Sequence, residues 1–415
     1  MKAPFVPTHP PRTAGPVASW RGFFGERART SVYGWSERMF ELPYYRRKVL
    51  RFDIHVLLDP ALIEHVTLTN HANYLKPSII KTLLGPMIGE GLLTADGPLW
   101  REQRKIVAAS FSPAAVQGVR PVFGTAARAA LAQWTDGEVR DVAADATRTT
   151  MLVIAETLFS ADPRLVSEEA LSDREGLKRT LFERLQAGGP GEDFLGGLIG
   201  ALQQRFPPDE ARALAIDNAA TFYLAGHETT SNALAWTLYL LSEQVDLQDT
   251  LAEEAQAALG SAGWGSDPVT TSLPRLHAAL QESLRLYPPA PRFDRQAAGS
   301  DELPNGEKVE PGHILSVWPW LLHRSRRLWD DPDAFDPERF APGKPKPDRF
   351  QYLPFGAGPR VCVGAQFAAR RGRRHGDDAA EGWTAAVDRT PQSMILSASM
   401  NNSERGNPVI ANASH

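Results

Sequence analysis

The stretch Phe355-Gly-Ala-Gly-Pro-Arg-Val-Cys-Val-Gly364 holds the only cysteine among 415 residues. A lone cysteine is usually a small buried hydrophobic residue. Here three glycines let the backbone turn tightly and approach a flat ligand closely. Arg360, two residues before the thiol, is placed to lower its pKa or to pair with an anion, and Phe355 can shield the sulfur from water. A thiolate in such a loop meets the requirements of an axial ligand of haem iron.

The composition excludes several other classes of protein. A chain with 42% hydrophobic residues and a net charge of -4 can bury a large core and gives no reason to expect nucleic-acid binding. A single cysteine excludes an internal disulfide and fits a reducing compartment. No P-loop and no dinucleotide-type glycine motif is present. Because prolines interrupt the first twelve residues, we expect no signal peptide and no membrane anchor, and a soluble cytoplasmic protein.

The pattern along the chain predicts one mainly α domain with a small β portion. No repeat and no Ser- or Gly-rich linker divides it. The expected elements are a strand over 49–58, an apolar loop over 76–95, successive helices over 112–260 with a loop at 187–192, a long buried helix over 210–244 capped by Asp209, a helix from Leu273-Pro274 to Tyr287, short strands beyond 298 including 314–317, and a proline-rich meander over 330–350.

A polar interruption lies inside the predicted long helix, at Leu224-Ala-Gly-His-Glu-Thr-Thr230. Glycine and threonine lower helix propensity, so an ordinary buried helix would avoid them. Ala225, Gly226 and Thr229 share one face and leave room against the helix. The Thr229 hydroxyl can bond back to a carbonyl one turn earlier. The alternative is that the helix ends at Gly226.

Two other pairs are spaced for neighbouring positions on a helix. Trp100 and Arg104 place an indole N–H and a guanidinium one turn apart, an arrangement that suits a carboxylate. Glu282 and Arg285 form an acid–base pair at i, i+3, which on most helices is a minor surface pair. We expect the histidines, including His323, to be structural rather than metal ligands.

The spacing Phe-x-x-Gly-x-Arg-x-Cys-x-Gly resembles the haem-binding loop of cytochromes P450. The 224–230 segment is similar to the acid–alcohol pair in that family's oxygen-binding helix, where the pair delivers protons for O–O bond cleavage. The resemblance implies a cytochrome P450 fold with haem b as cofactor and Cys362 as its iron ligand. It also implies that Thr229 and Glu228 are catalytic. The residues implied to bind the cofactor are Trp100, Arg104, Ala225, Gly226, Arg295, Phe355, Gly358, Arg360, Cys362 and Gly364.

The resemblance extends to the core and the substrate cavity. Glu282, Arg285 and Arg339 match a buried ionic network behind the haem, with a structural role. The residues expected to line an apolar cavity are Phe222, Ala225, Ala290, Pro291 and the aliphatic residues near 79–88. His227 lies off the Gly226/Thr229 face and is therefore a poor iron ligand.

The function that the resemblance implies is a haem-thiolate monooxygenase acting on an apolar small molecule. Because no flavin or iron–sulfur module is visible, we expect electrons from a separate ferredoxin and ferredoxin reductase, and a monomer. One alternative is a peroxide-driven haem-thiolate enzyme, which the Glu228-Thr229 pair disfavours. The other is a haem-binding but catalytically impaired protein.

The resemblance stops after Ala369. A long apolar helix should follow the cysteine loop, but the chain continues as Arg370-Arg-Gly-Arg-Arg-His-Gly-Asp-Asp378, where the glycines oppose a helix. We therefore interpret residues 1–369 as a single domain and residues 370–415 as a tail produced by a frame shift. The alternative is a native divergent C-terminus, with a basic patch for a redox partner.

Overall fold

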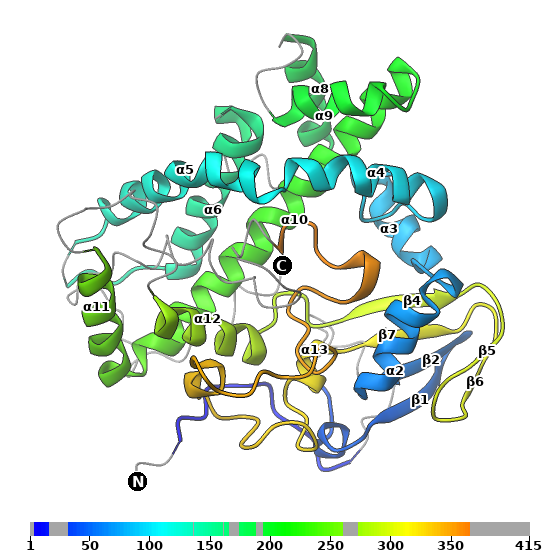
Figure 1. Cartoon of the computed structure of the whole chain (residues 1–415), viewed down its shortest axis with the longest axis vertical. Helices are drawn as coiled ribbons and strands as arrows, with labels where there is room; N and C mark the ends of the chain where they lie inside the picture. Colours follow the sequence, from blue (N-terminus) through cyan, green and yellow to red (C-terminus); the bar gives the residue numbers. More distant parts are fainter. Residues whose placement is uncertain are drawn as a thin grey trace.

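The computed structural model describes residues 4–15, 32–135, 137–160, 162–165, 174–187, 194–259 and 273–365. Its α-helices are α2 (Pro60–Glu64), α3 (Ser78–Ile88), α4 (Gly97–Ser110), α5 (Pro113–Leu131), α6 (Val142–Phe159), α8 (Arg174–Ala187), α9 (Phe194–Gln203), α10 (Pro208–Ser242), α11 (Val245–Leu259), α12 (Pro274–Leu286) and α13 (Pro319–Leu322). Its strands are β1 (Tyr44–Val49), β2 (Phe52–Leu57), β3 (Tyr74–Leu75), β4 (Phe293–Ala297), β5 (Asp301–Glu302), β6 (Lys308–Val309) and β7 (Ile314–Val317). The expected mainly α fold with a small β portion is confirmed (Figure 1).

Helix α10 crosses the middle of the molecule (Figure 1). It carries buried residues on every side, among them Leu214, Tyr223, Leu234 and Leu241, as expected for a helix surrounded by other elements. Helices α6, α8, α9 and α12 all pack against it. The long buried helix that the sequence predicts is therefore present, and it provides one wall of the pocket described below.

The strands form a five-stranded sheet of order β1-β2-β7-β4-β3 and a separate β5-β6 pair. Strands β2 and β7 are parallel, with Ile54 opposite Ile314, whereas the other pairs in the larger sheet are antiparallel. Strand β7 is buried along its whole length, as is usual for a strand covered on both faces. The sheet lies at one side of the molecule, at lower right in Figure 1.

Two short 3₁₀ helices and one π-helical turn lie next to functionally relevant segments. They are η3 (the π-helical turn His65–Thr69), η7 (Pro337–Phe340) and η8 (Gly358–Arg360). Turn η8 lies within the cysteine loop and packs against η3. This contact fixes the loop to the sheet side of the molecule.

Three predictions about element bounds are wrong. The strand predicted over 49–58 is β2, which begins only at Phe52, because Leu50 takes a positive φ of 54° and starts the turn that joins β1 to β2. The 76–95 segment contains α3, which accommodates Pro86 close to its end and stops at Gly89, where φ is 53°. Asp209 does not cap α10, since Pro207 is the N-cap and the helix begins at Pro208, a residue well suited to the first helical position.

The predicted ionic network behind the site is confirmed. Glu282 and Arg285 are fully buried and form two bonds of 2.7 Å, and Arg339 Nε lies 3.3 Å from the Glu282 carboxylate. Arg285 also donates to the carbonyls of His323 and Pro332, each at 2.7 Å. The network joins α12 to the meander before the cysteine loop. The Glu282–Arg285 pair is therefore a buried ion pair and not the minor surface pair that this spacing forms on most helices.

In the part of the chain that the structure describes, no helix is both long and apolar enough to cross a bilayer. The predicted 187–192 loop, apart from Ala187 at the end of α8, lies outside the described residues, as does the tail from residue 370.

Candidate functional site

The cysteine loop is closed by a hydrogen bond from the Cys362 N–H to the Phe355 carbonyl, at 3.0 Å. Gly358 takes a φ of +70°, and a Cβ there would overlap the carbonyl oxygen of Thr67 in η3. Both features require glycine at this position. Glycine at 358 therefore serves close backbone packing beneath the loop, which holds the cysteine in place.

The Cys362 side chain is exposed and lines the pocket, with protein atoms packed around its sulfur. Desolvation by these atoms raises the pKa of the thiol, whereas N–H groups of Gly364 and Ala365 and the guanidinium of Arg104 favour the thiolate. Of the two roles that the sequence allowed for Arg360, the structure shows the pairing with an anion, Asp96. Arg104, on α4, is the cation that acts on the sulfur.

A largely apolar cavity of about 410 Å³ lies against this loop. It reaches from the cysteine loop to α6, α10 and the segment before β4. Of the predicted site residues, the cavity is lined by Ala225, Gly226, Thr229, Arg295, Phe355, Arg360, Cys362 and Gly364. Trp100, Arg104, Glu228 and Gly358 do not line it. The structure thus brings the cysteine loop and the α10 motif to one cavity, although they are far apart in sequence.

Helix α10 continues through the glycine–threonine motif, so the alternative that it ends at Gly226 is excluded. The Thr229 hydroxyl donates to the Ala225 carbonyl at 2.7 Å, the back-bond expected from the sequence. A Cβ at Gly226 would lie 2.7 Å from the Ile154 side chain of α6, so this glycine permits close helix packing at the cavity wall. Glu228 is exposed and does not line the cavity.

His227 lies off the cavity, as predicted. Its ring is buried, and its Nδ1 is 2.6 Å from the Tyr223 carbonyl. Burial lowers its pKa, which suits a neutral imidazole that donates to the backbone.

Cationic side chains gather at one end of the cavity. Arg360 donates to the Ala95 carbonyl at 2.9 Å and pairs with the Asp96 carboxylate. Arg295 is buried, and burial next to Arg360 lowers its pKa to about 10. Lys76, which the sequence analysis missed, also lines the cavity, and burial next to Arg295 and Arg360 lowers its pKa to about 7.

This cationic cluster, Lys76, Arg295 and Arg360, is what a ligand with two carboxylates requires. Two neighbouring carboxylates, Asp96 and Asp294, partly offset it. Each also pairs with another cation, Lys81 and Arg292 respectively, so cations still outnumber anions there. Buried charges without enough partners are unfavourable, and two added carboxylates would correct the imbalance. A sulfur ligand, an apolar cavity and this cluster therefore fit haem, whose edge carries two propionates.

Trp100 and Arg104 lie behind the cavity rather than in it. The Arg360 guanidinium stacks 4.2 Å from the centre of the Trp100 ring, a cation–π contact. Trp100 thus contacts Arg360, and Arg104 acts on the sulfur. The predicted donation from Trp100 and Arg104 to a propionate stays a prediction.

The predicted apolar walls are confirmed in part. Phe222 and Ala290 line the cavity, whereas Pro291 and the aliphatic residues of 79–88 do not, because α3 directs Ile88 into the core beside α10 instead. The apolar lining that the sequence did not indicate includes Leu93, Phe111, Phe123, Val153, Ile154, Leu158 and Leu234. Most of these residues lie on helices whose apolar positions look like ordinary core.

The fold and the site define a haem-thiolate protein: the cysteine sulfur and the α10 threonine face one apolar cavity, with cations at its edge. Comparison with known proteins agrees. The cytochrome P450 family model matches residues 30–188 and 208–371. The chain therefore belongs to the cytochrome P450 family, a family of monooxygenases that are oxidoreductases.

Two curated relatives illustrate the range of the family. Cyclooctatin synthase of Streptomyces melanosporofaciens is 29% identical over 357 residues, covering 76% of each chain. Cytokinin hydroxylase of Arabidopsis thaliana is 30% identical over 329 residues, covering 68% of this chain and 63% of the relative. The chain thus spans less than two thirds of the length of some relatives.

Solved structures agree on the fold. A zebrafish cytochrome P450 solved with progesterone superposes with a TM-score of 0.71 at 24% identity, covering 85% of this chain and 89% of that chain. The haem domain of cytochrome P450DA gives a TM-score of 0.69 at 22% identity, covering 86% and 82%.

Proposed function

We propose that this chain is a haem b-dependent monooxygenase that hydroxylates an apolar small molecule with O2 and electrons from a separate ferredoxin and ferredoxin reductase. The observation that carries the proposal is the shared cavity, in which the Cys362 sulfur and the Thr229 side chain both face one apolar space. When bound, haem supplies the redox chemistry by which O2 is cleaved and one oxygen atom is inserted into a C–H bond.

The residues of the chain have distinct parts in this proposal. Cys362 supplies the thiolate ligand, and the N–H groups of Gly364 and Ala365 stabilise its charge. Lys76, Arg295 and Arg360 hold the propionates, while Trp100 supports Arg360 from behind. Phe355, at the start of the glycine loop, lines the cavity together with Cys362.

In the proposal, Thr229 and Glu228 deliver protons to the site. The Thr229 hydroxyl is fixed by its bond to the Ala225 carbonyl, so its oxygen can accept a further hydrogen bond inside the cavity. Glu228 is exposed on the adjacent position of α10 and can exchange protons with solvent. Apolar side chains such as Phe222 and Leu234 favour an apolar substrate in the same cavity.

The optical spectrum of the reduced, CO-treated chain after haem loading tests this proposal. A strongly red-shifted Soret band is expected for a thiolate ligand, and a spectrum without this shift contradicts the ligand assignment. Turnover of terpenoid and steroid probes with NAD(P)H, ferredoxin and reductase then tests the electron route. Equal turnover with hydrogen peroxide alone would favour the peroxide-driven alternative.

A haem-binding but impaired protein is the second candidate. It is favoured by the family match, which ends at residue 371 and leaves 44 of the 415 residues beyond it. We propose that residues 1–369 form the domain and that residues 370–415 are read out of frame. Translation of the neighbouring frames of the gene tests this: an apolar helical sequence in one of them is expected, and its absence in both rejects a frame shift.

The remaining proposals concern the state of the protein in the cell. One chain carries all the groups assigned to the site, which supports a monomer, and its single cysteine suits a reducing cytoplasm. Gel filtration of the haem-loaded chain tests the first proposal, and fractionation of the producing cells tests the second.

A further inference from the structure

A second group of chemically active side chains lies on the sheet, away from the cavity. Asp53 and His55 are two residues apart on β2 and therefore project from the same face. His313 directly precedes β7, and the parallel register that places Ile54 opposite Ile314 brings His313 alongside Asp53. None of the three lines the haem cavity.

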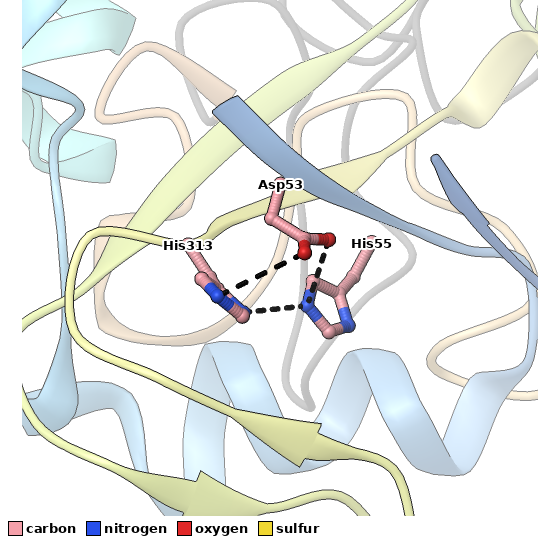
Figure 2. Close-up of side chains that lie close together, drawn as sticks. All are labelled: Asp53, His55 and His313. Atoms are coloured by element: carbon pink, nitrogen blue, oxygen red, sulfur yellow. Dashed lines mark hydrogen bonds and ion pairs between the residues drawn. The ribbon is translucent and has the colours of Figure 1, made fainter. Parts of the chain in front are cut away.

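The three side chains point toward one another (Figure 2). His55 Nε2 is 3.0 Å from His313 Nδ1 and 3.9 Å from Asp53 Oδ1, and His313 Nε2 is 4.0 Å from Asp53 Oδ2. One ligand atom can be chosen from each residue so that all lie within 4.8 Å of one another. Ligands bound at about 2.0–2.2 Å from Zn²⁺ lie roughly 3.3 Å apart in a tetrahedral site, so small side-chain rotations would suffice.

We propose that Asp53, His55 and His313 form a binding site for a divalent transition-metal ion such as Zn²⁺, which would link β2 to the turn before β7. Two imidazoles and one carboxylate are a donor set for Zn²⁺ and its first-row neighbours, and they disfavour Ca²⁺ and Mg²⁺. Three protein ligands leave a fourth position for water.

The surroundings of His55 support this assignment. Its other nitrogen, Nδ1, is 2.7 Å from the Tyr44 hydroxyl, so Tyr44 fixes the ring with Nε2 directed towards His313 and Asp53, as outer partners of metal-bound histidines do. The His55 side chain is fully buried, whereas Asp53 and His313 are 20% and 17% exposed, which gives an ion a route from solvent.

Arg46 is the competitor for this site. Its Nε and Nη2 each lie 2.9 Å from an oxygen of Asp53. The arginine side chain is 39% exposed, and its Nη1 lies 3.4 Å from Glu307, so Arg46 can release Asp53 and keep an acidic partner. The proposal therefore makes a specific demand: removal of Arg46 should strengthen metal binding, because a competing positive charge is lost.

Isothermal titration calorimetry of the full chain with Zn²⁺ tests the proposal. One ion per chain is expected in addition to any bound by the Cys362 thiol, so the titration is repeated in a Cys362→Ala background. In that background His313→Ala and Asp53→Asn should weaken binding at least about tenfold, whereas His71→Ala, an exposed histidine elsewhere, should not. Tyr44→Phe should weaken binding by roughly tenfold.

The Arg46→Ala variant separates a metal site from a purely hydrogen-bonded cluster. Tighter Zn²⁺ binding, together with a larger rise in Tm on addition of Zn²⁺, supports the site. The proposal is overturned if wild-type chain shows no saturable binding in the Cys362→Ala background. It is equally overturned if folded His313→Ala, checked by circular dichroism, binds Zn²⁺ as tightly as its parent.

Discussion

The Arg360 guanidinium lies 4.2 Å from the centre of the Trp100 ring while it pairs with Asp96, the residue that precedes α4. Two elements far apart in sequence, the cysteine loop and the start of α4, thus meet through one side chain. Arg360 also lines the cavity. It therefore has both a packing role and, in the proposed function, a role in cofactor binding.

Replacement of Arg360 with lysine should lower haem affinity about tenfold even though the charge is kept. Lysine cannot stack on the indole as a planar cation or bind Asp96 and the Ala95 carbonyl at the same time. Haem titration, followed by absorbance, measures the change. Arg101→Lys, on the exposed face of α4, is the matched control, and equal loss in both variants would contradict the assigned role.

A methyl group at Gly358 should disturb the cysteine loop, whereas one at Gly356 should be milder. Both glycines have positive φ, +70° and +76°, so both variants carry the same backbone strain. Only at Gly358 would a Cβ overlap the Thr67 carbonyl, since nothing lies within 4 Å of a Cβ at Gly356. Comparison of Gly358→Ala with Gly356→Ala in thermal unfolding and haem titration isolates this close approach. Equal effects would mean that loop strain, and not packing on η3, explains the glycine.

The cysteine loop shows what sequence could predict and what it could not. Spacing alone indicated Cys362 and the glycines, because their identities follow from chemistry local to the loop. The pairing of Arg360 with Asp96, and of Arg104 with the sulfur, depends on how α4 docks, which no local pattern encodes. Lys76 was missed for the same reason: an isolated lysine after a two-residue strand looks like an ordinary surface residue until the fold buries it beside Arg295.

The 224–230 motif of α10, by contrast, could be recognised from local sequence alone. Thr229 and Gly226 break the helical propensity of α10, so the sequence marks them directly. Errors arose where tertiary packing overrides local preference. Helix α3 forms despite Pro86, since its end packs Ile88 into the core, and Asp209 lost its capping role because Pro208 already begins α10.

Glu282→Ala should destabilise the fold by about 3–5 kcal/mol. The substitution leaves the fully buried Arg285 guanidinium without its carboxylate and removes the acceptor of the Asp336 N–H, at 2.9 Å. Urea unfolding followed by circular dichroism measures the change in the free energy of unfolding. Glu253→Ala, on the exposed side of α11, should stay within about 0.5 kcal/mol of wild type. A similar small change for Glu282→Ala would contradict the buried network.

Haem affinity should depend on pH in two opposite ways. Burial raises the pKa of the Cys362 thiol; because iron binds the thiolate, ligation releases a proton, and affinity falls about tenfold per pH unit below that pKa. Lys76, whose pKa burial lowers to about 7, holds a propionate only when protonated, so its contribution is present below pH 7 and disappears as pH rises.

Variants at the two positions should separate these effects in haem titrations across a pH series. Lys76→Met should remove the loss of affinity above pH 7, and Lys105→Met, an exposed residue of α4, should retain it. Cys362→Ala should remove the fall in haem affinity at pH values below the thiol pKa. Identical pH profiles for Lys76→Met and wild type would exclude Lys76 from propionate binding.

Thr229→Ala should lower the rate of product formation by roughly 10²-fold while haem binding is unchanged. The hydroxyl is the group that the structure fixes at the cavity wall, through its 2.7 Å bond to the Ala225 carbonyl, and alanine removes it without adding bulk. The measurement is product formed per NAD(P)H consumed, since loss of proton control should let electrons pass to O2 without product. Thr229→Ser keeps the hydroxyl and should restore most of the yield. Thr230→Ala, at the neighbouring cavity-lining position, should have little effect; if it lowers the yield as much as Thr229→Ala, general disturbance of the α10 wall, and not the Thr229 hydroxyl, explains the loss.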